Sequence, residues 1–369
     1  MLRPRTKRSL SPFRLANGDI LLARDVFGLG RRIPYDGSDA LWRLLRLMDG
    51  SRDLPALTRA VRRTHRGWDD LTTRRALARL EKLGVIEEGA GAVDAGLSPA
   101  EADRYSRNLD FFSLVTLGSP LSGVEIQRRL QAARVTILGV GAIGTATAAS
   151  LAAAGVGHLR LLDPDRVELS NLNRQILYRS GDVGRWKVDA AADHLKAINP
   201  HLKVTKQRRF VRSPRELGPL LDGCDLFILG ADRPHEILLW ANDAAVARGT
   251  PWLDNSYSGP RCAIALFVPG RTPCLRCLQH ELERRQRAEK VFVGQALFPE
   301  PAGNAVIAPT AGIAGHLGAL RSLYFLAGLR PEDDGVLVQL NLWTPGDVYV
   351  VRPKFWRACP ACGPGRPSA

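Results

Sequence analysis

The apolar run Val135-Thr136-Ile137-Leu138 leads directly into Gly139-Val140-Gly141-Ala142-Ile143-Gly144, and an alanine-rich stretch follows. This order predicts a buried strand, a glycine turn and a helix. The G-x-G-x-x-G spacing is typical of a phosphate-binding turn, because glycines allow close backbone approach and a helix N-terminus favours negative charge. Further on, Leu161-Leu162-Asp163 predicts a second strand that ends in an acid suited to ribose hydroxyls. We therefore expect a nucleotide-binding α/β domain, although this motif alone fits a dinucleotide as well as ATP.

Apolar strands alternate with helical stretches from residue 134 onward. The strand candidates are residues 135–138, 159–162, 204–210, 226–229, 252–254 and 264–268. Such alternation predicts a Rossmann-like, mostly parallel sheet with helices on both faces.

The composition is that of an ordinary globular chain with an excess of arginine. Its 369 residues predict about two domains. The net charge of +15 favours an acidic partner such as a nucleotide, an acidic peptide or nucleic acid, but scattered charges on solvated faces explain it equally well. The basic N-terminus has no apolar segment after it, and no apolar run is long enough to span a bilayer. These features predict a cytoplasmic enzyme without a membrane partner.

A small domain of its own is expected before the nucleotide domain. Short strands around residues 20–33 precede three amphipathic helices and a closing strand at residues 85–86, which is the pattern of a winged helix. We predict this domain over residues 1–92, a linker and helical lead-in over 93–131, and the nucleotide domain over 132–369.

The residues after the second strand separate ATP from a dinucleotide. They read Asp163-Pro164-Asp165, then S-N-L-N-R-Q over 170–175, G-R-W-K over 184–187 and I-N-P over 198–200. These motifs closely resemble the ThiF/MoeB family of adenylating enzymes, the bacterial relatives of ubiquitin-activating enzymes. The resemblance covers roughly residues 100–369 and implies ATP-dependent adenylation.

The family resemblance also implies a role for each matching residue. Asp163 would hold the ribose, Asp232 would bind Mg²⁺, and Arg107 would reach into the site of a partner subunit in a homodimer. Asp232 is followed by Arg233, where the family usually has asparagine. The phosphate and nucleotide contacts would come from Gly139, Gly141, Ala142, Gly144, Asp165, Asn171, Arg174 and Lys187. Taken singly, Arg174 and Lys187 would be ordinary surface charges, and only their joint spacing favours the functional interpretation.

Four of the six cysteines form two C-x-x-C pairs, Cys274 with Cys277 and Cys359 with Cys362. Four thiolates suit a tetrahedral structural zinc ion with no open coordination position, and the family has such a site. Cys224 and Cys262 are expected to be small core residues. The segment between the two pairs, which includes the crossover stretch 291–309, contains no cysteine. We therefore expect no enzyme thioester, and direct attack of a nucleophile on the adenylated group.

The front domain carries a second resemblance. The stretch from Asp39 to Ser51, with its Asp49-Gly50 turn, resembles PqqD-like peptide-recognition domains, although a generic winged helix remains the alternative. Such domains bind the leader of a ribosomally made peptide as an added β-strand. Together the two resemblances imply a peptide-maturation enzyme of the microcin C or pantocin type, in which adenylation leads to cyclisation, dehydration or amide formation.

Three other functions stay open at this point. A sulfur-carrier adenylyltransferase would activate a C-terminal Gly-Gly, and a non-catalytic protein would present a leader to a cyclodehydratase. A DNA-binding regulator would need a recognition helix with clustered arginines, for which Arg62, Arg63, Arg66, Arg74 and Arg75 are candidates. That interpretation leaves the nucleotide motif unexplained, so we do not expect a nucleic-acid partner.

Overall fold

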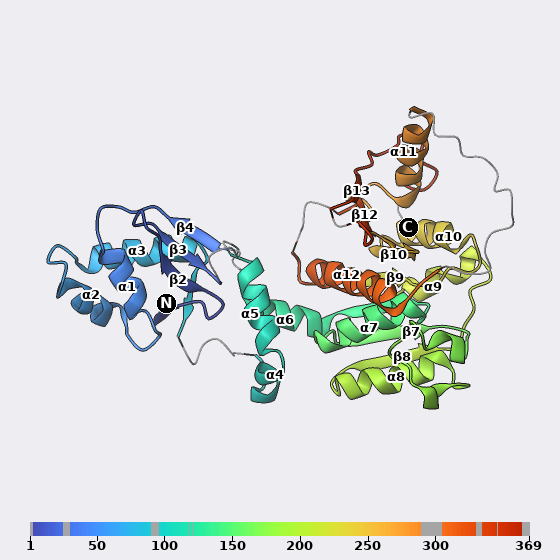
Figure 1. The fold of residues 1–369 in the computed structure, drawn as a ribbon, viewed down its shortest axis with the longest axis horizontal. Helices are drawn as coiled ribbons and strands as arrows, with labels where there is room; N and C mark the ends of the chain where they lie inside the picture. Colours follow the sequence, from blue (N-terminus) through green and yellow to red (C-terminus); the bar gives the residue numbers. More distant parts are fainter. Residues whose placement is uncertain are drawn as a thin grey trace. The chain divides into compact units, whose positions relative to one another are not determined.

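The computed structural model describes residues 3–24, 30–89, 96–117, 119, 121–288, 305–329, 334–344 and 346–363. The crossover stretch expected over 291–309 falls largely outside these residues. The chain divides into two compact units, Met1–Arg129 and Leu130–Ala369 (Figure 1). No helix in the described part of the chain is long and apolar enough to cross a membrane.

The first unit begins with a small α+β fold. An antiparallel sheet is formed by β2 (Ser11–Arg14), β3 (Ile20–Ala23) and β4 (Gly30–Ile33), and β1 (Pro4–Thr6) pairs with β5 (Ile86–Glu88). Between them lie α1 (Ala40–Leu47), α2 (Leu54–Arg62) and α3 (Asp70–Lys82). Asp53 and Asp69 cap α2 and α3, each accepting a backbone N–H from the first turn. Leu22, Leu44, Leu57 and Leu80 are fully buried in the shared core. The small N-terminal domain predicted from the sequence is thus present.

Two further helices and most of a third complete the first unit: α4 (Pro99–Arg104), α5 (Ser106–Val115) and α6 (Gly123–Ala132), which ends beyond Arg129. Ser98 and Glu101 form a capping box that starts α4. The end of α5 lies against the small fold, because Arg31 donates to the Leu117 carbonyl at 2.8 Å and Leu114 packs on its core. The helical lead-in therefore packs with the N-terminal fold, and α6 runs into the second unit.

The second unit is built on an eight-stranded sheet in the order β13-β12-β11-β10-β9-β6-β7-β8. The strands are β6 (Arg134–Leu138), β7 (His158–Leu162), β8 (Lys203–Gln207), β9 (Leu226–Leu229), β10 (Trp252–Ser258), β11 (Arg261–Phe267), β12 (Leu337–Asn341) and β13 (Val348–Val351). Strands β8, β7, β6, β9 and β10 are parallel, whereas β11, β12 and β13 continue antiparallel. The mostly parallel Rossmann-like sheet is confirmed, with an antiparallel half added to it.

Helices cover both faces of this sheet. One face packs on α7 (Ala142–Ala153), α8 (Lys187–Ile198) and α12 (Ala308–Leu326), and the other on α9 (Gly218–Leu221), α10 (Ile237–Arg248) and α11 (Leu275–Ala288). Helices α7 and α12 lie side by side (Figure 1) and meet through small residues. A Cβ added at Gly315 would lie 2.5 Å from the Ala146 Cβ, and the Thr147 hydroxyl donates to the Gly315 carbonyl at 3.0 Å.

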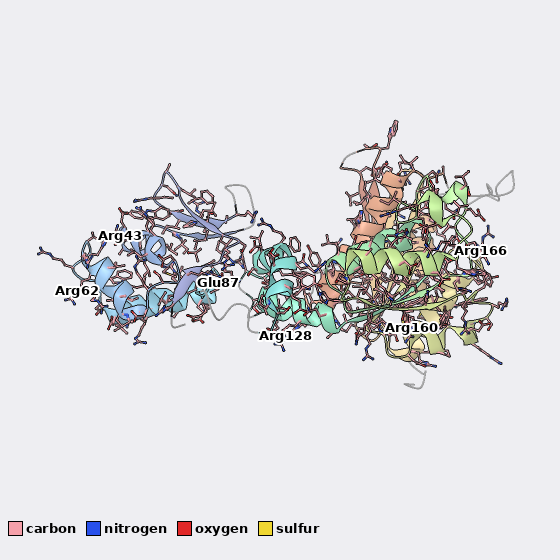
Figure 2. All side chains as sticks on the ribbon, turned by 90° about the horizontal axis from the view of Figure 1, so that it is seen from below. Arg43, Arg62, Glu87, Arg128, Arg160 and Arg166 are labelled. Carbon is pink, nitrogen blue, oxygen red and sulfur yellow. The ribbon has the colours of Figure 1, made fainter. Side chains whose placement is uncertain are left out.

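Positive charge is spread over both units. The arginines labelled in Figure 2 lie on α1 (Arg43), α2 (Arg62), α6 (Arg128), β7 (Arg160) and the loop after β7 (Arg166).

Candidate active site

The glycine turn joins β6 to α7 at the carboxyl edge of the sheet. Gly139 has a φ of +95°, and a Cβ there would lie 2.5 Å from the Ala231 backbone nitrogen. At Gly144 a Cβ would lie 2.0 Å from the Gly139 carbonyl oxygen, so both positions require glycine. Gly141 caps α7 without a side-chain hydrogen bond, and the first turn contains no acid. The exposed N–H groups and the helix dipole therefore suit a phosphate group at this turn.

Asp163 follows β7 and lies against the turn. Its carboxylate accepts the Val140 N–H and the Asp165 N–H, each at 2.8 Å, and its side chain is buried. Burial raises the pKa of Asp163, while the charge of Lys187 and the two N–H donors act in the opposite direction. Each oxygen has a lone pair left over, which suits the ribose hydroxyls expected from the sequence.

Lys187 begins α8 and is almost fully buried, and its ammonium forms an ion pair with Asp165 at 2.8 Å. Asn171, in the short 3-10 helix η1 (Leu169–Asn171), is also buried, and its side-chain oxygen accepts the Glu168 N–H at 3.1 Å. The structure therefore brings Asp163, Asp165 and Lys187 together beside the glycine turn.

Arg174 and Asp232 converge on a residue that the sequence did not single out. Arg174 donates to the Ser170 carbonyl at 2.8 Å and to Asn173 Oδ1 at 2.9 Å, and its charge acts on Tyr257 of β10. Burial raises the pKa of Tyr257, the Arg174 contact lowers it, and the charge of Asp232 raises it. Asp232 is exposed and follows the end of β9. A cation, a phenol and a carboxylate from three separate segments thus lie at the carboxyl edge of the sheet.

Two other residues near the turn support a nucleotide site. The hydroxyl of Tyr178 donates to the Val140 carbonyl at 2.8 Å and to the Lys187 carbonyl at 3.3 Å, which ties the glycine turn to the start of α8. Gln175 is buried close to Gly141, and its Oε1 has no hydrogen-bond partner among the described residues. A buried acceptor without a partner is costly, so a ligand that offers a hydrogen-bond donor, such as a hydroxyl or an amine, would stabilise this position.

Trp186 precedes Lys187 and contacts two arginines. The guanidinium carbons of Arg166 and Arg208 lie 4.0 and 5.0 Å from the centre of the indole ring. Arg166 also donates to the Gly184 carbonyl at 2.6 Å. These contacts hold the loop after β7 against the start of α8 and so fix the approach to the site.

Arg107 lies on α5 in the first unit, and its side chain is 89% exposed. Its Nη1 is 3.8 Å from an Asp110 oxygen, a long ion pair in an exposed position. This leaves the guanidinium accessible to another molecule.

The four cysteines of the two C-x-x-C pairs lie together. All of their sulfur atoms are within 4.8 Å of one another, with Cys274 3.5 Å from Cys359 and Cys277 3.4 Å from Cys362. A tetrahedral zinc ion with bonds of about 2.3 Å separates its sulfur ligands by roughly 3.8 Å, so this cluster can bind zinc. Burial raises the pKa of Cys274 to about 11, which means that a thiolate at this position needs a cation nearby.

The surroundings of the cluster fix both cysteine pairs. Asn242 on α10 accepts the Leu275 N–H at 2.9 Å, and Asp243 holds Arg276 through two hydrogen bonds of 2.8 and 2.6 Å. On the other side, the ring of Trp356 stacks on His280 at 4.4 Å. The expectation for the two remaining cysteines agrees with their packing, since Cys224 and Cys262 lie in or against separate hydrophobic clusters.

This fold and site define a class of protein, a nucleotide-binding α/β enzyme with a four-cysteine cluster. A model of the ThiF family matches residues 105–360. The chain is 33% identical over 261 residues to molybdopterin-synthase adenylyltransferase of Escherichia coli (strain K12), covering 68% of this chain and 92% of that protein. It is 34% identical over 264 residues to the sulfur carrier protein ThiS adenylyltransferase of Bacillus subtilis (strain 168), covering 70% and 71%.

A crystal structure of E. coli MccB with ATP superposes with a TM-score of 0.77 at 20% sequence identity, covering 98% of this chain and 99% of that one. This likeness concerns the fold, and it extends over both units. The chain belongs to the ThiF family and is an ATP-dependent adenylyltransferase.

Proposed function

We propose that this protein adenylates a carboxylate or an amide oxygen in a ribosomally made precursor peptide. The observation that carries the proposal is the first unit. The match to the E. coli molybdopterin-synthase adenylyltransferase covers only 68% of this chain, whereas the likeness to MccB covers 98%. MccB is named as the microcin C7 biosynthetic enzyme and has been crystallised with N-formylated MccA. An added unit of this kind is expected in an enzyme that holds a peptide as well as ATP.

In the proposed reaction a peptide oxygen attacks the α-phosphorus of ATP. A P–O bond forms to the peptide, and the bond to the β-phosphate breaks, so that pyrophosphate leaves. A nucleophile on the peptide or on a second substrate then attacks the activated carbon, loses its proton and expels AMP. The chain has no cysteine between Cys277 and Cys359, which favours this direct transfer over an enzyme thioester.

The residues at the glycine turn suit the first step. The N–H groups at the start of α7 would bind phosphate oxygens, and Arg174, Lys187 and Asn171 would contact the triphosphate. Asp163 would hold the ribose, and Asp232 would bind the Mg²⁺ that accompanies ATP. Cations fixed around the α-phosphate lower the barrier, because negative charge builds up on its oxygens in the transition state. The four-cysteine cluster would hold a structural zinc ion.

The first unit would bind the leader segment as PqqD-like domains do. Its three-stranded sheet has edges at β2 and β4, to either of which an extended peptide could add as a further strand. Arg31 and Arg32 on β4 are exposed, although Arg31 donates to the Leu117 carbonyl and Arg32 pairs with Asp19 at 2.6 Å. An acidic leader at this edge would compete with these contacts.

A homodimer would complete the site. Arg107 is exposed on α5, and the family resemblance assigns it to the partner's nucleotide. Ile313 and Leu320, two turns apart on α12, are 40% and 37% exposed. Apolar side chains on one face of a helix favour a subunit contact there.

Two alternatives remain. The names of the E. coli and B. subtilis relatives favour a sulfur-carrier adenylyltransferase acting on a C-terminal Gly-Gly. The other is a non-catalytic protein that presents a leader to a cyclodehydratase.

Pyrophosphate exchange into ATP separates these possibilities. We expect a precursor peptide, taken from a short reading frame next to the gene, to stimulate exchange, and Asp232→Asn to abolish it. Asp222→Asn, an exposed acid away from the site, is the matched control. Stimulation by a Gly-Gly sulfur carrier alone would support the first alternative. Peptide binding without exchange would support the second.

Two further measurements test the roles of the first unit. Deletion of residues 1–92 is expected to weaken peptide binding and to spare ATP binding; unchanged peptide affinity would contradict leader recognition by this region. Mixing Arg107→Ala with Asp232→Asn subunits is expected to restore part of the exchange activity lost in each variant, since a mixed dimer has one intact site. Failure of the mixture to regain activity would contradict the role of Arg107 in a partner's site.

A further inference from the structure

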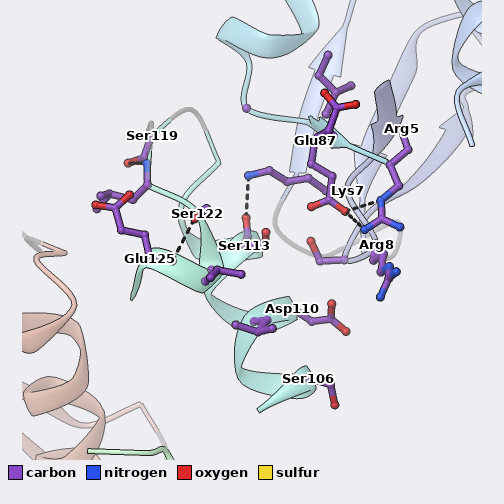
Figure 3. A pocket seen from close by; sticks show the side chains of 18 of the residues that line it. Arg5, Lys7, Arg8, Glu87, Ser106, Asp110, Ser113, Ser119, Ser122 and Glu125 are labelled. Atoms are coloured by element: carbon purple, nitrogen blue, oxygen red, sulfur yellow. Dashed lines mark hydrogen bonds and ion pairs between the residues drawn. The ribbon is translucent and has the colours of Figure 1, made fainter. Parts of the chain in front are cut away.

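The first unit contains a large polar cavity between the β1–β5 pair and the helices α5 and α6 (Figure 3). Its volume is about 1560 Å³. Small-molecule sites are typically about 300–1,000 Å³, so this cavity exceeds the size of a small ligand. Serine side chains of α5 and of the turn before α6 line one side, and Arg5, Lys7 and Arg8 line the other.

Lys7 is buried, and its ammonium group makes few contacts that would offset the loss of water. It is 7% exposed, and the only hydrogen bond that its ammonium makes among the described residues is a long one of 3.5 Å to the Ser113 carbonyl (Figure 3). Burial lowers the pKa of Lys7, and the charge of Glu87 acts in the opposite direction. Glu87 is itself paired with Arg5 at 2.9 Å. A buried ammonium in this situation gains from any carboxylate that reaches it.

The two residues after Lys7 add further donors to the same wall. Ser9 is 3% exposed, and its hydroxyl has no hydrogen-bond partner in the described part of the chain. Arg8 is exposed, and the described residues form no ion pair with it. Two of the acids around the cavity are already engaged, since Glu125 pairs with Arg129 at 2.6 Å and Glu88 accepts the Arg3 N–H. The cavity is also lined by Glu81 and Asp103, which are exposed, and by Asp110, which is 3.8 Å from Arg107. The wall therefore contains three consecutive residues, Lys7, Arg8 and Ser9, whose side-chain donors lack strong acceptors among the described residues.

We propose that this cavity is a second peptide-binding site, in which Lys7, Arg8 and Ser9 bind an acidic side chain of the precursor peptide. The inference rests on the proposed peptide substrate, and it adds a subsite separate from the edges of the β2–β3–β4 sheet. The volume favours several peptide residues over a single small acid. The serine hydroxyls of α5 and of the turn before α6 suit the backbone of such a segment, because they can both donate and accept hydrogen bonds.

The test uses the full chain and a fluorescein-labelled peptide of Gly-Asp-Ser repeats, with a Gly-Asn-Ser peptide as its uncharged counterpart. Lys7→Met keeps the length of the side chain and removes its charge, and Arg63→Met on the exposed end of α2 is the matched control. Fluorescence anisotropy should show about ten- to hundredfold weaker binding of the acidic peptide to Lys7→Met, as expected for a lost charge-assisted hydrogen bond. Binding to Arg63→Met should be unchanged, and Asn for Asp in the peptide should abolish the dependence on Lys7.

A second measurement does not depend on the folding of the variant. In the wild-type protein, acetylation of the Lys7 amine by acetic anhydride, followed by mass spectrometry, should slow when the acidic peptide is bound. Equal affinity for wild type and Lys7→Met together with unprotected Lys7 would overturn the cavity proposal. Pyrophosphate exchange with the precursor peptide, measured in parallel, tests the proposed adenylation reaction separately from the cavity site. Exchange without any effect at Lys7 removes only the cavity site, whereas Lys7-dependent binding without exchange removes the proposed reaction.

Discussion

The ammonium of Lys187 lies 2.8 Å from the carboxylate of Asp165, with the lysine buried and the acid 59% exposed. The carboxylate of Asp165 thus balances the positive charge of the buried Lys187 beside the glycine turn. An incoming triphosphate would compete with Asp165 for the same ammonium, and the exposed acid can turn away into water at little cost. Lys187 is therefore held close to the place where phosphate charge is expected.

Replacing Lys187 with methionine should lower the rate of pyrophosphate exchange by about 10²–10³-fold, the usual cost of losing one group that stabilises a charged transition state. Lys196→Met, an exposed change on the same helix, should have no effect. The measurement is exchange at saturating ATP, with ATP affinity determined separately. An unchanged rate in Lys187→Met would contradict a role at the α-phosphate.

Tyr257→Phe should slow exchange about tenfold, because it removes the phenol hydroxyl on which the charges of both Arg174 and Asp232 act. Tyr349→Phe on the edge strand β13 is the control. If both variants behave like the wild type in exchange assays over a range of ATP concentrations, Tyr257 is only a packing residue.

Removal of the proposed zinc ion by chelation should unfold the region around the four-cysteine cluster, because four thiolates within 4.8 Å of one another repel unless a cation lies between them. Elemental analysis should find about one zinc ion per chain. Cys359→Ser should lose this zinc and melt roughly 5–15 °C lower in thermal unfolding. Cys224→Ser should retain the metal, and loss of zinc in that variant would argue against the assignment of the ligands.

Asp254 on β10 should make stability depend on pH. Burial raises its pKa to about 6, against about 3.9 for an unfolded chain. The folded state holds this proton more tightly, so the contribution of Asp254 to stability falls as the pH rises from about 4 to about 6 and stays low above that. Asp254→Asn should therefore stabilise the protein by about 1–2 kcal/mol at pH 8, and by less at pH 5. Chemical denaturation at both values, with Asp222→Asn as the control, measures the difference; an equal effect at both pH values would contradict the shifted pKa.

Much of the fold was readable from local patterns. The glycine turn, the parallel strands and the two cysteine pairs each depend on residues close together in the sequence, and the structure confirms the predicted sheet and the gathering of the cysteines. The strand over residues 252–254 was predicted too short, because the polar Asn255 and Ser256 end the apolar run although β10 continues to Ser258. The strand over 204–210 was predicted too long and ends at Gln207.

The residues that sequence reasoning missed act across long separations. Tyr178 reaches the carbonyl of Val140, Tyr257 meets Arg174, and Lys7 reaches α5. A single tyrosine or lysine belongs to no spacing pattern that would predict such a contact, so the contact is seen only in the folded chain. Gln175 is an intermediate case, since it belongs to a recognisable motif but its burial beside Gly141 could not be foreseen.

The close contact of α7 and α12 has a mechanical consequence. At Gly315 there is no room for even a methyl group against Ala146, so at this point the two helices have no side chain between them that could repack to absorb a shift. A displacement of α12 would be passed to α7 as a rigid-body movement, and with it to the glycine turn at the start of α7. The helix contact thereby links the position of α12 to the backbone N–H groups that are expected to bind phosphate.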